Sequence, residues 1–355
     1  MTSSESVQAG SSRGLAVAGK VAGSLGPFFG LLLTVALFGW LTRDSGTFLS
    51  LYNWRVILVQ TVIVGTAALG MTVIMISGGI DLSVGSVVAL VSVVVATAAS
   101  GSGWQLPAVL GGSTLKVPAV SMGLALLIGT AVGVLCGSIN GLLVTGLRVV
   151  PFIITLGTLK VYRGMAKWLS NSTGVYVPDE ARPWWLGRIL ATEPTPSWLL
   201  VAPGVWGLLA LSILLALVLR YAVLGRHIYA VGSNEATARL CGINVPGVKV
   251  LVYSLAGLAT GLAGLLQFTY LRATGDPVTA DGLELQVIAA VVIGGASLSG
   301  GEGTVLGTLI GCLIMSVLTN GCVHAGLSNA SQDVIIGAII VAAVAIDRLR
   351  RSRAS

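Results

Sequence analysis

The sequence predicts an all-α, polytopic membrane protein, on the evidence of its composition, its hydropathy and the spacing of its apolar runs. Only 9% of the 355 residues are charged and 55% are hydrophobic, whereas a soluble domain carries roughly a quarter charged residues. The mean hydropathy is +0.94. Because about 20 apolar residues cross the hydrocarbon core as a helix, a chain of this length holds about ten transmembrane helices with short connections.

Apolar runs recur along the chain at intervals that suit membrane-spanning helices. The fifth is interrupted by Lys160, Arg163 and Lys167, and the eighth is short for a full crossing, so nine or eleven spans also fit. The runs cover residues 25–42, 55–77, 84–100, 117–147, 149–170, 199–219, 249–273, 283–297, 303–323 and 331–347.

The two ends of the chain differ from its apolar middle. Residues 1–24 are polar and rich in Ser and Gly, which predicts a cytoplasmic N-terminal tail and a retained first helix rather than a cleaved signal peptide. Residues 25–347 form one predicted membrane domain, and residues 348–355 form a basic cytoplasmic C-terminal tail.

Positive charge predicts that both termini are cytoplasmic, since cytoplasmic loops carry an excess of Lys and Arg. In this orientation the cytoplasmic segments carry more Lys and Arg residues than the outer loops. The three cations within the fifth run are not counted on either side. The cytoplasmic cations are Arg13, Lys20, Arg148, Arg220, Arg226, Arg239, Lys249, Arg348, Arg350, Arg351 and Arg353. The outer cations are Arg43, Arg55, Lys116, Arg182, Arg188 and Arg272.

Several function classes find no support in the sequence. The net charge of +7 is spread between apolar runs rather than gathered on one face, so we expect no nucleic-acid binding. No HExxH or GxSxG motif is present, and the segment 14–21 lacks the Ser or Thr of a phosphate loop, so no catalytic residue is predicted. The cysteines lack metal-ligand spacing, so no metal site is expected. They are Cys136, Cys241, Cys312 and Cys322.

Glycines repeat every four residues in two of the runs. Residues four apart share one face of a helix, and a glycine face lets a neighbouring backbone approach closely. We therefore predict tight helix packing at these positions, or a sliding surface in a moving transporter. The fourth run carries Gly129, Gly133, Gly137 and Gly141, and the ninth carries Gly303, Gly307 and Gly311.

A carboxylate lies beside the hydrocarbon core between the second and third runs. The segment 77–86 contains Asp81 and Ser83, and an acidic residue there needs a partner, a helix to cap or contact with water. Either side chain can cap the third helix, or Asp81 can act directly in solute passage or gating. Asp81, Ser83, Asn140 and Thr155 are the candidate path or gating residues because they are polar and lie in or beside spans.

Two further segments indicate a transporter. The glycine-rich stretch 294–301 breaks the eighth run, and many transporters expose backbone polar groups where a helix breaks near the midplane. The internal loop 220–248 contains Asn234 or Ser233 as a helix cap and Gly242 as a stop, which predicts a short helix through Leu240 facing the cytoplasm. An ordinary loop against the lipid headgroups is the alternative.

Four motifs, in order, resemble those of the ribose/xylose/galactose class of ABC-transporter permeases, and the resemblance covers about residues 55–345. The outer loop 177–203 is longer and richer in Pro and Trp than that pattern. The motifs are GGIDLSVGS at 78–86, NGLLVTGLRVVPFIITLGT at 140–158, GRHIYAVGSNEATARLCGI at 225–243 and VIGGASLSGGEGTVLGT at 292–308.

The resemblance implies a type II-like importer permease of the bacterial inner membrane, with a second permease copy as homodimer or heterodimer. It further implies cytoplasmic ABC ATPase subunits, which would bind ATP and Mg while this chain holds no cofactor, and an external sugar-binding protein. The 220–248 loop would then be the coupling element. Its candidate residues are Gly232, Ser233, Asn234, Glu235, Ala236, Arg239 and Gly242.

The implied solute is a monosaccharide or a similar small neutral polyol, which suits a largely uncharged interior. An ion-coupled secondary transporter is the alternative, and it would normally need a carboxylate within a span. The acidic residues nearest the runs are all expected at or beyond helix ends, which favours the ATP-driven importer. They are Asp81, Asp276, Asp281, Glu284 and Glu302.

Overall fold

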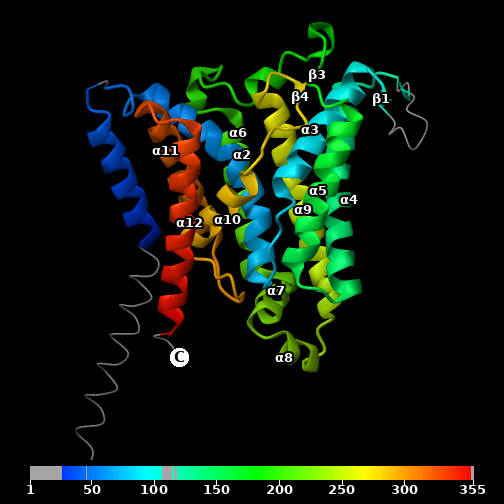
Figure 1. Cartoon of the computed structure of the whole chain (residues 1–355), viewed down its shortest axis with the longest axis vertical. Coiled ribbons are helices and arrows are strands. Elements are labelled where there is room, and N and C mark those ends of the chain that lie inside the picture. Colours follow the sequence, from blue (N-terminus) through cyan, green and yellow to red (C-terminus); the bar gives the residue numbers. More distant parts are fainter. Residues whose placement is uncertain (1–25, 45, 106–113, 116–117, 353–355) are drawn as a thin grey trace, which may run out of the picture.

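The computed structural model describes residues 26–44, 46–105, 114–115 and 118–352, and this part of the chain is almost wholly helical (Figure 1). The predicted tail at 1–24 lies outside it. Each predicted apolar run contains one helix. These helices are Gly26–Leu41, α2 (Leu51–Ile76), α3 (Val84–Ser100), α4 (Met122–Leu147), α5 (Pro151–Leu169), α6 (Pro203–Tyr221), α9 (Val245–Tyr270), α10 (Leu283–Ile293), α11 (Val305–His324) and α12 (Asn329–Ser352).

Not every helix has the length of a full span. Among the described residues, five helical segments are long and apolar enough to cross a membrane, so the predicted count of about ten spans is not established by length and composition. The five segments are Leu51–Ile76, Met122–Leu147, Ser197–Tyr221, Val245–Tyr270 and Val305–His324.

Local caps move some boundaries from those predicted. Ser50 accepts a hydrogen bond from the Asn53 amide, so α2 begins before residue 55. Asn244 accepts from the Gly247 amide, so α9 begins before residue 249. α12 continues through Ser352, so the basic segment after residue 347 is a continuation of that helix and not a separate tail as far as the structure describes it.

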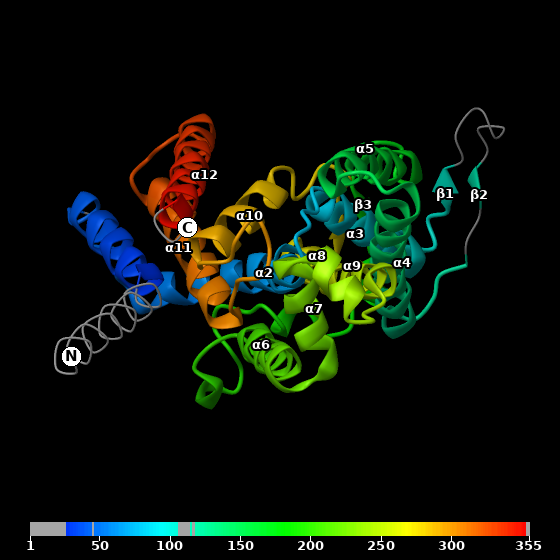
Figure 2. The same cartoon turned by 90° about the horizontal axis from the view of Figure 1, so that it is seen from below.

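The predicted cytoplasmic loop at 220–248 is largely helical. α6 extends to Tyr221, α7 covers Val223–Ser233 and α8 covers Glu235–Leu240. In Figure 1, α7 and α8 lie at the end of the molecule where α12 finishes, and Figure 2 views that end directly. The helix Gly26–Leu41 begins near mid-height of the molecule and runs toward the opposite end (Figure 1).

Short elements cover the opposite end. β1 (Trp104–Gln105) pairs with β2 (Thr114–Leu115), and β3 (Val175–Tyr176) pairs with β4 (Thr274–Gly275), both antiparallel. The long loop before α6 carries three 3-10 turns. These turns are η2 (Asp179–Ala181), η3 (Leu186–Arg188) and η4 (Ser197–Leu199).

α4 and α9 pack through their glycines. A Cβ added to Gly137 would lie 2.8 Å from the Gly257 Cα, and one added to Gly133 would lie 2.5 Å from the Gly261 Cα. Gly141 faces Val250 on the same helix, whereas Gly129 also meets α3 through Val95. Side chains larger than hydrogen therefore have no room along this contact.

The second glycine series differs in part from the prediction. Gly307 and Gly311 lie on α11 and face the carbonyl groups of Gly294 and Ala290, at the end of α10. Gly303 precedes α11 and has a φ of +157°, so it does not extend the helical face. It packs beside Ile76, because the chain is still turning into α11 at that point.

α3 and α10 begin inside the molecule after irregular segments. Their first turns face one another, since a Cβ on Gly85 would collide with the Ala280 carbonyl and the Glu284 carboxylate. Glu284 is buried in the first turn of α10. Two helix N-termini and an acidic side chain thus meet in the interior, which is the arrangement of discontinuous helices in many transporters.

Candidate functional site

The predicted path residues form one buried hydrogen-bonded cluster. Asp81 Oδ1 accepts from the Ser83 amide at 2.7 Å and from the Ser83 hydroxyl at 2.6 Å. Asn140 Nδ2, from α4, donates to Ser83 Oγ at 2.8 Å and lies 3.5 Å from Asp81 Oδ2. Tyr162, from α5, donates to Asn140 Oδ1 at 3.1 Å. The cluster joins α4 and α5 to the segment that leads into α3.

Thr155 reaches the same segment from α5. Its hydroxyl lies 3.2 Å from the Ile80 carbonyl oxygen, to which the Tyr253 hydroxyl also donates at 3.4 Å. Asp81 is 5% exposed and Asn140 and Thr155 are fully buried. The structure therefore brings all four predicted residues together, but as a compact core of polar groups.

The capping role considered for Asp81 and Ser83 is wrong. Ser83 occupies the N-cap position of α3, but no side chain there accepts from the first turn of the helix. The Ser83 hydroxyl donates to Asp81 instead, and the Asp81 carboxylate also accepts from the amide of Ser83, two residues later. This is an Asx turn, a local side-chain-to-backbone bond that competes with capping.

Arg163, one of the three cations that interrupt the fifth apolar run, has partners inside the protein. Its guanidinium donates to the carbonyl oxygens of Thr279 at 2.6 Å and Pro277 at 3.1 Å, and it lies 3.6 Å from Asp281. Its side chain is 12% exposed, whereas Lys160 on the same helix is exposed. Arg163 thus fixes the irregular segment that leads into α10.

The predicted coupling segment forms an exposed helix with a defined cap. Asn234 Oδ1 accepts from the Thr237 amide at 2.9 Å, which begins α8. Glu235 pairs with Arg239 at 3.3 Å and with Lys249 of α9 at 2.6 Å. Gly242, with a φ of +82°, turns the chain after α8. Ala236 is exposed on the same short helix.

α7 anchors α8 to the ends of two long helices. Gly232 packs against the Ile76 carbonyl at the end of α2, and Ser233 lies beside Gly301 before α11. The Tyr229 hydroxyl donates to the Gly303 carbonyl at 2.8 Å, and burial raises the pKa of Tyr229, which keeps that donor protonated. α7 therefore connects α8 to the C-terminal end of α2 and to the segment that precedes α11.

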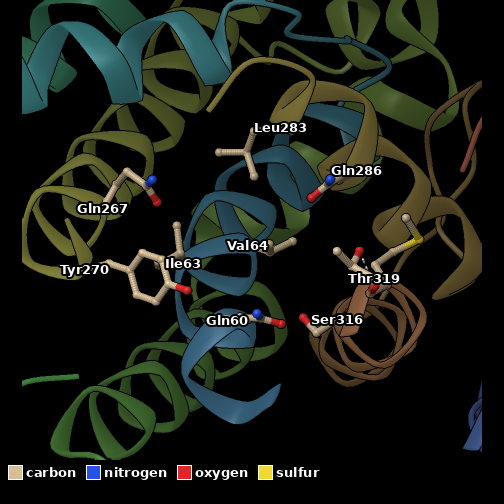
Figure 3. Close-up of a pocket in the computed structure, with 10 residues that line it drawn as sticks. Gln60, Ile63, Val64, Gln267, Tyr270, Leu283, Gln286, Ser316 and Thr319 are labelled. Carbon is tan, nitrogen blue, oxygen red and sulfur yellow. Dashed lines mark hydrogen bonds between the residues drawn. The ribbon is translucent and has the colours of Figure 1, made fainter. Parts of the chain in front are cut away.

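A pocket lies beside the first half of α2, between α2, α9, α10 and α11 (Figure 3). It has a volume of about 210 Å³. Figure 3 shows Gln60 and Ser316 pointing toward each other and Gln286 pointing in from α10. The lining residues are Gln60, Ile63, Val64, Gln267, Tyr270, Leu283, Gln286, Met315, Ser316 and Thr319.

Three glutamines in apolar runs are a sequence signal for this pocket. Gln60, Gln267 and Gln286 each interrupt an apolar run, and a polar amide inside a span is expensive unless it is bonded or meets a polar solute. Only the meeting of four helices shows that they share one site. Buried Glu284 was likewise expected at a helix end, but that end lies in the interior.

Three features define a membrane transport protein. The apolar helices form a bundle in which some segments are interrupted, a pocket with amide and hydroxyl groups lies between four helices, and an exposed helix is connected to the ends of long helices. The chain belongs to the family described as the permease component of the branched-chain amino acid transport system, whose model matches residues 54–344. This membership and the apolar helices identify a multi-pass protein of the bacterial inner membrane.

Curated relatives cover nearly the whole chain. The ribose import permease protein RbsC of Escherichia coli K12 is 37% identical, over 90% of this chain and 92% of its own length. RbsC of Bacillus subtilis 168 is 38% identical, over 91% and 92%. The L-arabinose ABC transporter permease protein AraH of Azospirillum brasilense is 32% identical, over 91% and 88%. No solved structure matches this chain.

Proposed function

We propose that this chain is the membrane-spanning permease subunit of an ATP-driven importer for a monosaccharide or a similar neutral polyol. Relatives named for ribose and L-arabinose import support the solute class. The pocket between α2, α9, α10 and α11 has no charged side chain in its lining, which suits a neutral solute better than an ion.

The observation that carries the mechanism is the connection from exposed α8, through α7, to the inner ends of α2 and α11. Leu240 at the end of α8 is 88% exposed, and an apolar side chain on a fixed, protruding helix suits insertion into a partner groove. ABC ATPase subunits, which bind ATP and Mg, occupy that position. The permease itself makes and breaks no covalent bond and carries no cofactor.

Closure of two ATPase subunits then moves two coupling elements together and alternates the access of the solute path. This requires a second permease copy, and a solute-binding protein delivers the solute from outside. Both termini face the cytoplasm in this arrangement. For the C-terminus, the position of α8 at the same end of the molecule as the end of α12 supports it (Figure 1).

Buried Glu284 favours one alternative, an ion-coupled secondary transporter, because carboxylates within spans mark ion pathways. The two functions differ in their source of energy. ATP-driven import needs the copurified ATPase and is insensitive to ionophores in proteoliposomes. Solute uptake by this chain alone, driven by a proton or sodium gradient, would establish the alternative.

The test extracts the tagged chain in mild detergent, identifies the copurifying subunits and measures ATP hydrolysis. We expect an ABC ATPase to copurify and to be lost, at least tenfold, in Leu240→Asp. Leu200→Asp is the matched control, since Leu200 is also exposed but precedes α6 at the other end of the molecule. If both variants lose the ATPase equally, or if both retain it, α8 is not the docking element.

A further inference from the structure

Two polar atoms in the pocket between α2, α9, α10 and α11 are buried without a hydrogen-bond partner within the described chain. They are Gln60 Oε1 and Ser316 Oγ. An unpaired buried polar group costs free energy comparable to a lost hydrogen bond, and more where lipid surrounds the protein. Two such atoms that face one another indicate a place that receives a polar molecule.

The Ser316 hydroxyl is unusual among the buried hydroxyls on long helices. Thr61, Thr66 and Ser212 each donate to the carbonyl four residues earlier, which satisfies them without any outside partner. Thr319, one turn after Ser316 on α11, also bonds to its own helix, at the Met315 carbonyl. Ser316 is 4% exposed and forms no such bond. The Ser316 hydroxyl, on a residue that lines the pocket, therefore has no partner on its own helix.

The two unpaired atoms have complementary chemistry. Gln60 Oε1 only accepts a hydrogen bond, whereas the Ser316 hydroxyl both donates and accepts. A hydroxyl group placed between them donates to Gln60 and accepts from Ser316, so one solute hydroxyl satisfies both atoms. A carboxylate would lack the proton that Gln60 Oε1 requires, and an ammonium could donate to both atoms but would leave the Ser316 O–H without an acceptor.

The remaining lining extends this selectivity. Gln286 and Gln267 add amide groups from α10 and α9, and Leu283 and Met315 supply an apolar wall. Gln267 Nε2 is already held by the Thr279 hydroxyl at 2.8 Å, which fixes the side chain. The volume of about 210 Å³ far exceeds the about 10–15 Å³ that one water needs. A small ring with several hydroxyls meets polar groups on its edge and apolar groups on its faces.

We propose that this pocket is a binding site for a neutral polyhydroxylated solute on its way through the permease, with Gln60 and Ser316 reading one hydroxyl. This rests on the proposed function and assigns the contact residues that it leaves open. The site lies between α2 and α11. The C-terminal end of α2 touches α7, and α11 follows Gly303, whose carbonyl accepts from Tyr229 of α7. Motion of α7 therefore reaches both walls of the pocket.

The test uses the whole importer, with its ATPase and binding protein, in proteoliposomes. ATP-driven uptake of D-ribose, L-arabinose, D-galactose and myo-inositol is measured first for the unchanged chain. If none is taken up, the proposed function fails and the site fails with it. If at least one is taken up, Gln60→Leu and Ser316→Ala are expected to lower its uptake at least tenfold, with assembly and basal ATP hydrolysis within twofold.

Matched controls carry the same changes away from the pocket. Gln332→Leu removes a buried amide on α12, and Ser212→Ala removes a buried hydroxyl on α6. Both are expected to keep uptake within twofold of the unchanged importer. Uptake at the control level in Gln60→Leu and Ser316→Ala would overturn the site while leaving the proposed function intact.

Ser316→Thr separates solute contact from folding. It keeps the hydroxyl and adds one methyl group to the pocket, so we expect a larger fall in uptake for the six-carbon solutes than for the pentoses. Where only one size class is taken up, the KM is expected to rise severalfold with assembly unchanged. An equal fall for every solute, with loss of assembled complex, would show a structural role and overturn the proposal.

Discussion

Asn140 donates a hydrogen bond to the Ser83 hydroxyl, 2.8 Å away, and so ties the middle of α4 to the residue at which α3 begins. Ser83 in turn donates to Asp81. The first turn of α3 is therefore positioned from a neighbouring helix, not by a cap of its own. The same turn faces Glu284 of α10.

Replacing Asn140 by Leu keeps the volume but removes the amide. Ser83 and Asp81 then lose their partner from α4, and a buried polar group left unpaired costs about 1–3 kcal/mol. We expect a clear fall in the melting temperature of the detergent-solubilised chain. Ser138→Ala, on the same helix, is the control, because Ser138 is only half-buried and bonds mainly to α4 and Ser254. Equal melting temperatures for both variants would contradict this.

Gly137→Val is expected to destabilise the chain, because its side chain would overlap the backbone at Gly257 on α9. Overpacking a well-packed core costs about 1–3 kcal/mol, and more when the obstacle is backbone. Gly146→Val lies on the same helix, where an added Cβ meets nothing within 4 Å. The readout is the monodisperse fraction on size-exclusion chromatography. A Gly137 variant as monodisperse as its control argues against close α4–α9 contact.

Arg163→Leu is expected to release the irregular segment before α10 and to lower solute uptake at least fivefold. Arg163→Lys should rescue little, since a lysine ammonium cannot span the Pro277 and Thr279 carbonyls as the guanidinium does. Lys160→Leu removes an exposed charge from the same helix and should have little effect. Full rescue by lysine would mean that charge alone matters at this position.

Tyr229→Phe removes the hydroxyl that joins α7 to the Gly303 carbonyl. The bond is worth about 0.5–1.5 kcal/mol, so folding and basal ATP hydrolysis should persist while solute transported per ATP falls. Tyr221→Phe is the control, because Tyr221 is 65% exposed at the end of α6. An unchanged ratio of transport to hydrolysis would show that this contact does not transmit motion.

The helical class and the position of every long apolar helix were predictable, because hydropathy depends on local composition. The α8 cap at Asn234 and its stop at Gly242 were also predictable from local chemistry. By contrast, the sequence predicts a loop where α7 lies. Its buried residues Ile228 and Val231 are too few to mark a helix until the ends of α2 and α11 cover them.

The site was only partly visible in the sequence because its contacts join residues far apart in the chain. Asp81 and Asn140 were each polar in an apolar setting, but their pairing depends on how α3 and α4 pack. Gln60 and Ser316 form no notable motif and meet only through the packing of α2 against α11. The prediction that Asp81 caps α3 was wrong because its carboxylate accepts from the Ser83 amide, which is nearer in the chain than the amides of the first turn of α3.

The seam between α4 and α9 is made largely of main-chain atoms, at Gly133 and Gly137 on one side and Gly257 and Gly261 on the other. Contacts of this kind leave no space between the two backbones, so we expect the two helices to move as one unit. We expect this pair of helices to keep its packing during transport. The chain is then expected to bend at the irregular segments before α3 and α10, where it can change direction without disturbing the packing of α4 against α9.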